Sequence, residues 1–296
     1  MLTKGRTAMD GFSGIGYAIF STDAGSIGGG ARSHAKGTNN IEAYLKVLKA
    51  GHLIGTMMKE NNHLARKLAK EAIDLDPKYP RPYFSLAMTH SIDVLKRWTK
   101  SPKESLSLMK KYMDKGIELD ESSVEGVRLL AFYHDRKQEW DKALASYERA
   151  VSLRPDGRNI RDLAIYLARR GSFDEAIAMF EKLKRLDPFP VNFVYGILGL
   201  TYFHLGRYED ALETYKKLLE LAQKGEYSLI TTHRQLAATY AMLGQDEEAQ
   251  YHIAELLKVN PKHSIKNYAK YAYKLYENKA DADRVLNALR KAGLPE

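Results

Sequence analysis

From about residue 39 onward, apolar residues recur every three or four positions, which is the spacing of a helix that buries one face. Glycine, proline and acidic residues interrupt this pattern at regular intervals. Alternation of apolar and polar residues, the mark of a half-buried strand, is not sustained there. The pattern therefore predicts a succession of amphipathic helices.

The helical pattern also repeats. Four alanines that occupy the same place in it, Ala143, Ala176, Ala211 and Ala249, are separated by 33, 35 and 38 residues. A small residue there lets a second helix approach the first closely. Self-similarity at a nearly fixed period of this size indicates a solenoid, in which each repeat is one helix pair.

The boundaries of the helices are marked by residue types with a physical role. The first helix of a pair ends at Gly171, Gly206 or Gly244, where a left-handed residue is needed. Acidic residues then suit the positive N-terminus of the second helix; they are Asp174, Glu209 and Asp246. Prolines stop the second helix because they force the preceding residue out of the helical region; they are Pro155, Pro188 and Pro261.

These residues resemble the tetratricopeptide repeat, whose pattern of Leu-Gly/Ala, Tyr, Ala, Phe/Tyr, Ala and Pro spans 34 residues. The resemblance covers about residues 46–263 in six units, and a last pair near 265–292 would be the cap that such stacks need. The second unit has roughly ten extra residues and uses Met109, Met113 and Gly116 for packing. The resemblance implies an all-α, right-handed α-solenoid of antiparallel helix pairs over residues 39–296.

Residues 1–38 differ in composition and are interpreted as a glycine-rich leader or linker. Nine of the 21 glycines of the chain fall within residues 1–40, and glycine disfavours helix. A local strand is expected at Tyr17–Ser21. A secretory signal is disfavoured because the apolar run after Lys4 and Arg6 is short and broken by glycine. Gly14-x-Gly16 lacks the strand, helix and third glycine of a dinucleotide loop.

Two stretches carry a narrower resemblance. Residues 36–46, KGTNNIEAYLK, and residues 289–296, LRKAGLPE, are similar to the ends of the C-terminal repeat region of bacterial adenylate/guanylate cyclase–tetratricopeptide proteins. The cyclase domain of those proteins has no counterpart in residues 1–38. The resemblance therefore implies a regulatory or docking module in a nucleotide-cyclase signalling system, without cyclase activity.

No recognisable constellation for catalysis is present. The chain has no cysteine, which excludes disulfides, thiolate metal sites and cysteine nucleophiles. Nine histidines are present, but none forms a His-x-x-x-His or His-Glu-x-x-His pair. They are interpreted as partly buried structural residues, with His90 and His134 at packing positions. We therefore expect a non-enzymatic protein without a cofactor or a bound metal.

The expected function is binding of a protein or peptide partner in the concave groove of the solenoid. In the resembling family the first helix of each pair lines this groove. The transferred positions combine apolar residues with arginines, a lining suited to a peptide with apolar anchors and acidic residues; they are Phe84, Met88, Arg128, Phe132, Arg158, Arg161, Phe193, Leu200, Phe203 and Arg234. The family's carboxylate-clamp type uses a Lys and Asn set instead. The alternative is that these residues pack or pair within the chain.

Charge points to a second candidate surface. Of the formal net charge of +9, residues 1–38 contribute +2 and residues 96–115 contribute +5. Clustered positive charge beside Trp98 could bind RNA or an anionic surface. The basic residues concerned are Lys96, Arg97, Lys100, Lys103, Lys110 and Lys111. A solvated amphipathic helix with Leu106, Met109, Tyr112 and Met113 as its core stripe is favoured over nucleic-acid binding.

Composition bears on the class of protein and on its location. Apolar residues make up 44% of the chain and charged residues 28%, as in a folded globular protein. No apolar run is long enough to span a membrane. The absence of cysteine is compatible with a reducing compartment, and a cytoplasmic location is expected. The sequence leaves the identity of the partner and the oligomeric state open.

Overall fold

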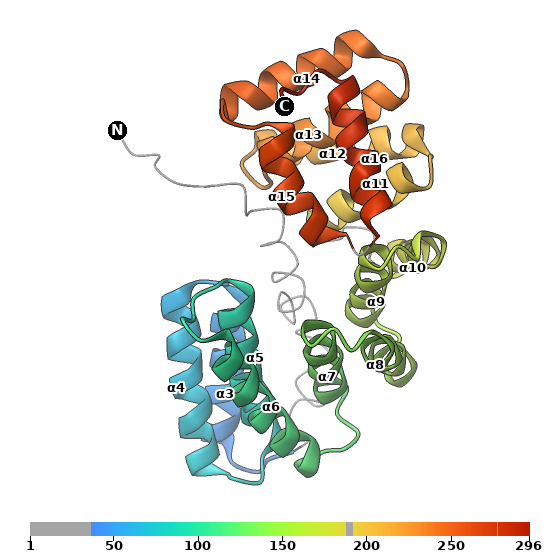
Figure 1. Ribbon diagram of the computed structural model, residues 1–296. Helices are drawn as coiled ribbons and strands as arrows, with labels where there is room; N and C mark the ends of the chain where they lie inside the picture. Colours follow the sequence, from blue (N-terminus) through green and yellow to red (C-terminus); the bar gives the residue numbers. More distant parts are fainter. Residues whose placement is uncertain (1–36, 188–191, 277) are drawn as a thin grey trace. The chain divides into compact units, whose positions relative to one another are not determined.

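The computed structural model describes residues 37–187, 192–276 and 278–296, and Figure 1 shows their arrangement. Within these residues the chain forms 14 helices and no strands. The predicted all-α solenoid of helix pairs is thereby confirmed. The expected leader, its strand at Tyr17–Ser21 and the helix stop at Pro188 lie outside the described residues.

The helices belong to two compact units that meet in sequence at Pro155 and Asp156. We call the described residues up to Pro155 the N-terminal unit and Asp156–Glu296 the C-terminal unit. The N-terminal unit contains α3 (Ile41–Gly55), α4 (Lys59–Leu75), α5 (Pro80–Leu95), α6 (Pro102–Leu119), α7 (Val124–Arg136) and α8 (Trp140–Leu153). The C-terminal unit contains α9 (Gly157–Arg169), α10 (Phe173–Leu186), α11 (Phe193–His204), α12 (Tyr208–Gln223), α13 (Leu229–Met242), α14 (Asp246–Val259), α15 (Ile265–Leu275) and α16 (Lys279–Lys291).

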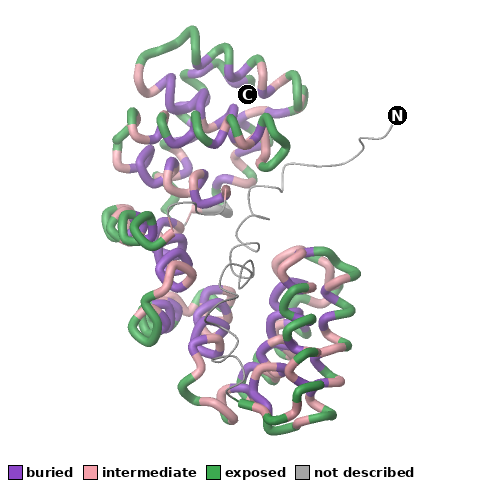
Figure 2. The backbone as a smooth tube through the Cα atoms, turned by 180° about the vertical axis from the view of Figure 1, so that it is seen from behind, coloured by how far each residue is buried: buried purple, intermediate pink, exposed green. Residues whose placement is uncertain are grey.

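Consecutive helices pack as pairs, as the repeat pattern predicts. In four of the pairs the predicted alanine anchors, Ala143, Ala176, Ala211 and Ala249, are fully buried. In Figure 2 second helices such as α10 and α14 carry both buried and exposed residues, whereas the first helices α9 and α13 have no exposed residue. This arrangement follows from the amphipathic period, because only a buried stripe facing a neighbour stabilises a short helix.

The helix ends follow local rules. Gly171, Gly206 and Gly244 have φ values of +83°, +74° and +73°, as expected for a left-handed residue after a helix. Three pairs have another residue in place of this glycine. The left-handed conformation is adopted there by Met57, Arg97 and Gln138, with φ values of 53°, 54° and 60°. These three helix ends were not predicted from the sequence, because no glycine marks them.

The long second pair of the N-terminal unit uses its extra residues for packing. Met109 and Met113 are fully buried in α6, as predicted. A Cβ atom on Gly116 would lie 2.5 Å from the Phe84 ring, so the absence of a side chain lets α5 and α6 pack closely. The α6 helix is therefore part of the core, and its basic residues occupy the outer side.

The last pair, α15 and α16, completes the C-terminal unit. After α16 the chain turns at Gly293, where φ is +89°, and Leu294 is buried. The Ile265 N–H donates to the Pro295 carbonyl over 2.8 Å, which ties the segment after α16 to the start of α15. The pair occupies the place in sequence that was predicted for the cap.

Candidate functional site

The predicted binding residues lie on the first helices of their pairs. In the N-terminal unit α3 packs beside α5 and α5 beside α7; in the C-terminal unit α11 packs beside both α9 and α13. Phe84 and Met88 lie on α5, and Arg128 and Phe132 lie on α7. The C-terminal unit holds the other six: Arg158, Arg161, Phe193, Leu200, Phe203 and Arg234. Each unit thus presents its own part of the predicted surface.

The aromatic members of this set contribute to the core. Phe84, Phe132, Phe193 and Phe203 are each at most 5% exposed. The Phe84 ring meets the backbone of both Gly116 and Gly126, because a Cβ on either residue would come within 3.1 Å of it. These aromatic rings therefore pack within the protein, which is the alternative given in the sequence analysis. Leu200 and Arg158 are half-buried, and a role for the set in partner binding stays a prediction.

The three arginines at equivalent repeat positions, Arg128, Arg161 and Arg234, are also largely buried, at 6%, 5% and 9% exposure. Arg161 approaches the carboxylate of Asp162, with Nη2 and Oδ1 3.5 Å apart. The guanidinium of Arg234 lies 4.2 Å from the centre of the Tyr268 ring. Burial of a guanidinium costs solvation energy, so these positions are unlike ordinary solvated surface arginines.

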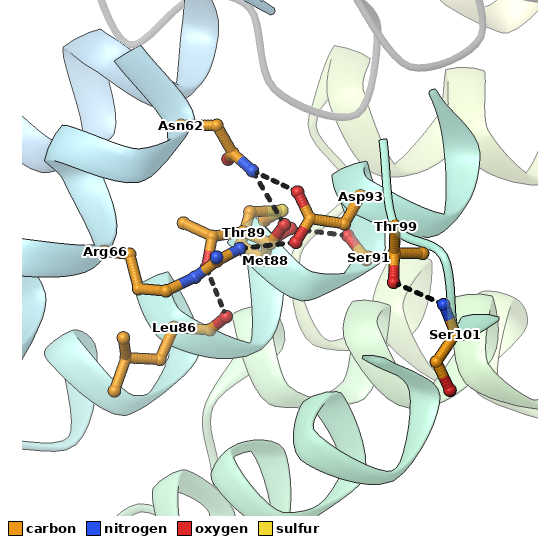
Figure 3. A network of polar contacts seen from close by, with 9 residues as sticks. All are labelled: Asn62, Arg66, Leu86, Met88, Thr89, Ser91, Asp93, Thr99 and Ser101. Atoms are coloured by element: carbon orange, nitrogen blue, oxygen red, sulfur yellow. Dashed lines mark hydrogen bonds and ion pairs between the residues drawn. The ribbon is translucent and has the colours of Figure 1, made fainter. Parts of the chain in front are cut away.

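A polar network that sequence reasoning missed joins α4 to α5 (Figure 3). The Asn62 amide donates to the Asp93 carboxylate over 2.8 Å and to the Thr89 carbonyl over 3.0 Å. Arg66 donates from Nη2 to Asp93 over 2.7 Å and from Nε to the Thr89 hydroxyl over 3.1 Å. Asn62 and Arg66 stand four residues apart on one helix face, but Asp93 lies 31 residues from Asn62. Only the packing of the helices reveals the network, which holds a buried carboxylate.

The buried histidines follow the structural interpretation. His90 stacks on Tyr112 with ring centres 5.8 Å apart, and burial lowers the pKa of His90 to about 4. His134 is half-buried, and its Nδ1–H donates to the Glu139 carboxylate over 2.6 Å. His233 and His252 face each other with their Nδ1 atoms 2.9 Å apart. No group of three or more potential metal ligands occurs among the described residues.

The basic residues of 96–115 have different environments. Arg97, Lys100, Lys103, Lys110 and Lys111 are exposed, whereas Lys96 is half-buried. Lys110 pairs with Asp114 over 2.6 Å. Met109 and Met113 point into the core, and Leu106 and Tyr112 pack against it as the predicted stripe. Residues 96–101 therefore form a connection and the rest of this stretch lies in the amphipathic helix α6, while binding of RNA or an anionic surface stays a prediction.

Comparison with known families identifies the repeats. Residues 129–190 and 192–262 each match a family model described as tetratricopeptide repeat. This part of the chain therefore consists of tetratricopeptide repeats, as the sequence resemblance implied. No curated protein matches the chain in sequence. No helix of the described residues is both long enough and apolar enough to cross a membrane.

Solved structures of similar fold include a protein described as a tetratricopeptide protein. A structure from a functional characterization of Pseudomonas aeruginosa pilF has a TM-score of 0.57 at 14% identity, covering 76% of this chain and 96% of that one. YrrB, described as a protein with an unusual peptide-binding site, has a TM-score of 0.50 at 17% identity, covering 66% and 93%. A human IFIT1 dimer with m7Gppp-AAAA has a TM-score of 0.57 at 17% identity, covering 84% and 59%. At such identities the likeness establishes the fold alone.

Proposed function

We propose that this protein is a non-catalytic interaction scaffold whose first helices receive a peptide or an extended segment of a partner protein. The observation that supports it most is the recurrence of a buried arginine at one repeat position in three pairs, Arg128, Arg161 and Arg234. Solenoids expose extended surfaces on which successive repeats contribute equivalent positions to one ligand. A tetratricopeptide fold in general serves as a scaffold for protein interactions, which is consistent with this proposal.

The chemistry of the arginines suits an acidic partner. A guanidinium offers a planar fork of N–H donors that matches a carboxylate, and partial burial strengthens such a pair. The neighbouring aromatic rings hold the helices in place, so little ordering is required when a segment docks. That YrrB is described as having a peptide-binding site agrees with a peptide ligand, although its likeness here extends to the fold alone.

A pull-down tests the proposal. Because the three arginines are at most 9% exposed, replacement by Glu would bury new negative charge and risk unfolding. The test therefore uses the triple variant Arg128→Gln, Arg161→Gln and Arg234→Gln in the full chain. Proteins recovered from a lysate of the source cells by wild type and variant are compared by mass spectrometry. We expect loss of the specific partner from the variant.

The matched control carries the same change in charge on the outer helices. Arg149 on α8, Arg185 on α10 and Arg290 on α16 are exposed, and their replacement by Gln should leave partner recovery unchanged. Equal recovery by both triple variants and wild type would refute the assignment. A nucleotide cyclase among the recovered proteins would specify the regulatory form of the proposal. Recovery of RNA, steeply weakened by salt, would point to the basic residues of 96–115 instead.

A further inference from the structure

The guanidinium of Arg234 on α13 is a buried cation without a carboxylate partner in the described chain. Arg234 is 9% exposed, and its recorded contact is with the face of the Tyr268 ring on α15, 4.2 Å away. No ion pair or hydrogen bond of Arg234 to another described residue is present. Arg66 shows what a partnered arginine looks like in the same protein, with Asp93 only 2.7 Å away.

The Tyr268 ring that this guanidinium contacts belongs to a core cluster that includes tyrosines from several elements. The positive charge of Arg234 lowers, and burial raises, the pKa of each of four tyrosine hydroxyls; for Tyr227 the net result is a pKa of about 12. The four are Tyr215 on α12, Tyr227 after α12, Tyr271 on α15 and Tyr276 just after α15. Arg169 adds a second positive charge that acts on Tyr271. The surroundings of the Arg234 guanidinium are therefore aromatic and electropositive.

Two further polar atoms near Arg234 lack a partner. The Tyr276 hydroxyl and Nε2 of His263 are both buried and make no hydrogen bond within the described part of the chain. His263 packs against the Tyr268 ring, with ring centres 5.9 Å apart. Burial, aided by the charge of Arg234, lowers the pKa of His263 to about 4, so its ring is neutral at pH 7. Buried polar atoms are normally hydrogen-bonded, so these two groups are open to a hydrogen bond from water or from a ligand.

The carboxylate of Asp281 acts electrostatically on Tyr276 but does not neutralise Arg234. Asp281 lies beside His204, with Oδ1 and Nδ1 3.8 Å apart; burial raises the pKa of Asp281, and the positive charge of Arg284 opposes this. Arg234, the Tyr276 hydroxyl and Nε2 of His263 can all donate hydrogen bonds. A planar anion with two oxygens satisfies a guanidinium fork and leaves acceptor capacity for the two other donors.

We propose that Arg234, together with Tyr268, Tyr276 and His263, forms a subsite between α13 and α15 that binds the carboxylate of an acidic side chain. The subsite rests on the proposed function, because it supplies the acidic contact of the docked segment. It differs from the Lys and Asn set of the family's carboxylate clamp in its residue types. The aromatic walls favour an Asp or Glu flanked by an apolar residue, since the tyrosine rings bury apolar area around the charge.

The first test uses sodium 3-phenylpropionate and its neutral analogue 3-phenylpropionamide as probes on the full chain. Histidine and tyrosine side-chain resonances are followed by NMR during titration. We expect the carboxylate, but not the amide, to shift His263 and to raise its pKa, because a bound anion favours the imidazolium. Arg234→Gln should weaken carboxylate binding at least tenfold, whereas Arg185→Gln on the exposed face of α10 should leave it unchanged.

A second measurement guards against loss of folding. An unpartnered buried cation does not support the fold, so Arg234→Met should keep or raise the midpoint of thermal unfolding, whereas Arg66→Met should lower it. A fall for Arg234→Met comparable to that for Arg66→Met would overturn the proposal, as would equal binding of acid and amide. If Arg234→Gln abolishes probe binding yet the full partner is recovered normally, the subsite stands and the partner docks elsewhere. If partner recovery requires Arg128 and Arg161 but probe binding is unchanged by Arg234→Gln, the proposed function is supported and the subsite is refuted.

Discussion

Two glycines within helices of the N-terminal unit offer a matched test of how tightly the helices pack. Gly116 lies near the end of α6 and Gly51 near the end of α3, and neither has a positive φ. A Cβ on Gly116 would lie 2.5, 2.8 and 2.9 Å from three atoms of the Phe84 ring, which is 3% exposed. A Cβ on Gly51 would meet nothing within 4 Å.

The two substitutions Gly116→Ala and Gly51→Ala share one favourable contribution. Alanine in a helix stabilises by about 0.5–1 kcal/mol relative to glycine, mainly through backbone entropy. Only Gly116→Ala adds overpacking, which typically costs about 1–3 kcal/mol. We therefore expect a gain of about 0.5–1 kcal/mol for Gly51→Ala and a net loss of roughly 1–2 kcal/mol for Gly116→Ala. The difference between the variants isolates the cost of displacing the Phe84 ring.

Urea unfolding followed by tryptophan fluorescence measures both variants. Trp98 and Trp140 are the two tryptophans of the chain, and both lie in the same unit as the two glycines. The signal therefore reports on that unit alone. If Gly116→Ala proves as stable as Gly51→Ala, the close contact between α6 and Phe84 is wrong, and with it the packing role assigned to Phe84.

Three further predictions concern the ends, the core and the acid sensitivity of the protein. Gln138→Gly should stabilise by about 1 kcal/mol, because Gln138 is exposed and its φ of 60° strains any residue except glycine; Gln138→Ala, which keeps the strain, is the control in urea unfolding. Arg66→Met should destabilise by about 3–5 kcal/mol, because it leaves the buried Asp93 carboxylate without its cation; a smaller effect than that of exposed Lys67→Met in the same melts would contradict this. Burial lowers the pKa of His90, His252 and His263 to about 4 and that of His204 to about 3. The unfolded chain takes up these protons near pH 6.5 and the folded chain only near pH 4, so stability is full above pH 6.5 and falls as the pH drops towards 4, by up to about 1.4 kcal/mol per pH unit for each histidine. A free energy of unfolding that stays constant from pH 7 to 4.5 would contradict it.

The candidate site was only partly predictable. The repeat register placed Arg128, Arg161 and Arg234 on the first helices of their pairs, and the structure puts them there. Their near-complete burial was not predictable, because it depends on which neighbouring helices cover each side chain. The contact of Arg234 with Tyr268, 34 residues further along the chain, likewise depends on how α13 and α15 pack.

Local chemistry explains why the helix pairs and the ends marked by Gly171, Gly206 and Gly244 could be determined from the sequence alone. Each of these signals acts within a few residues and can therefore be recognised in the sequence. The signals are the alanine anchors, the glycines after the first helices and the acidic first turns. The network of Asn62, Arg66 and Asp93 and the unpartnered guanidinium of Arg234 were decided by tertiary structure. Charge and hydrogen bonding between distant residues depend on which faces meet, and only the packed helices determine that.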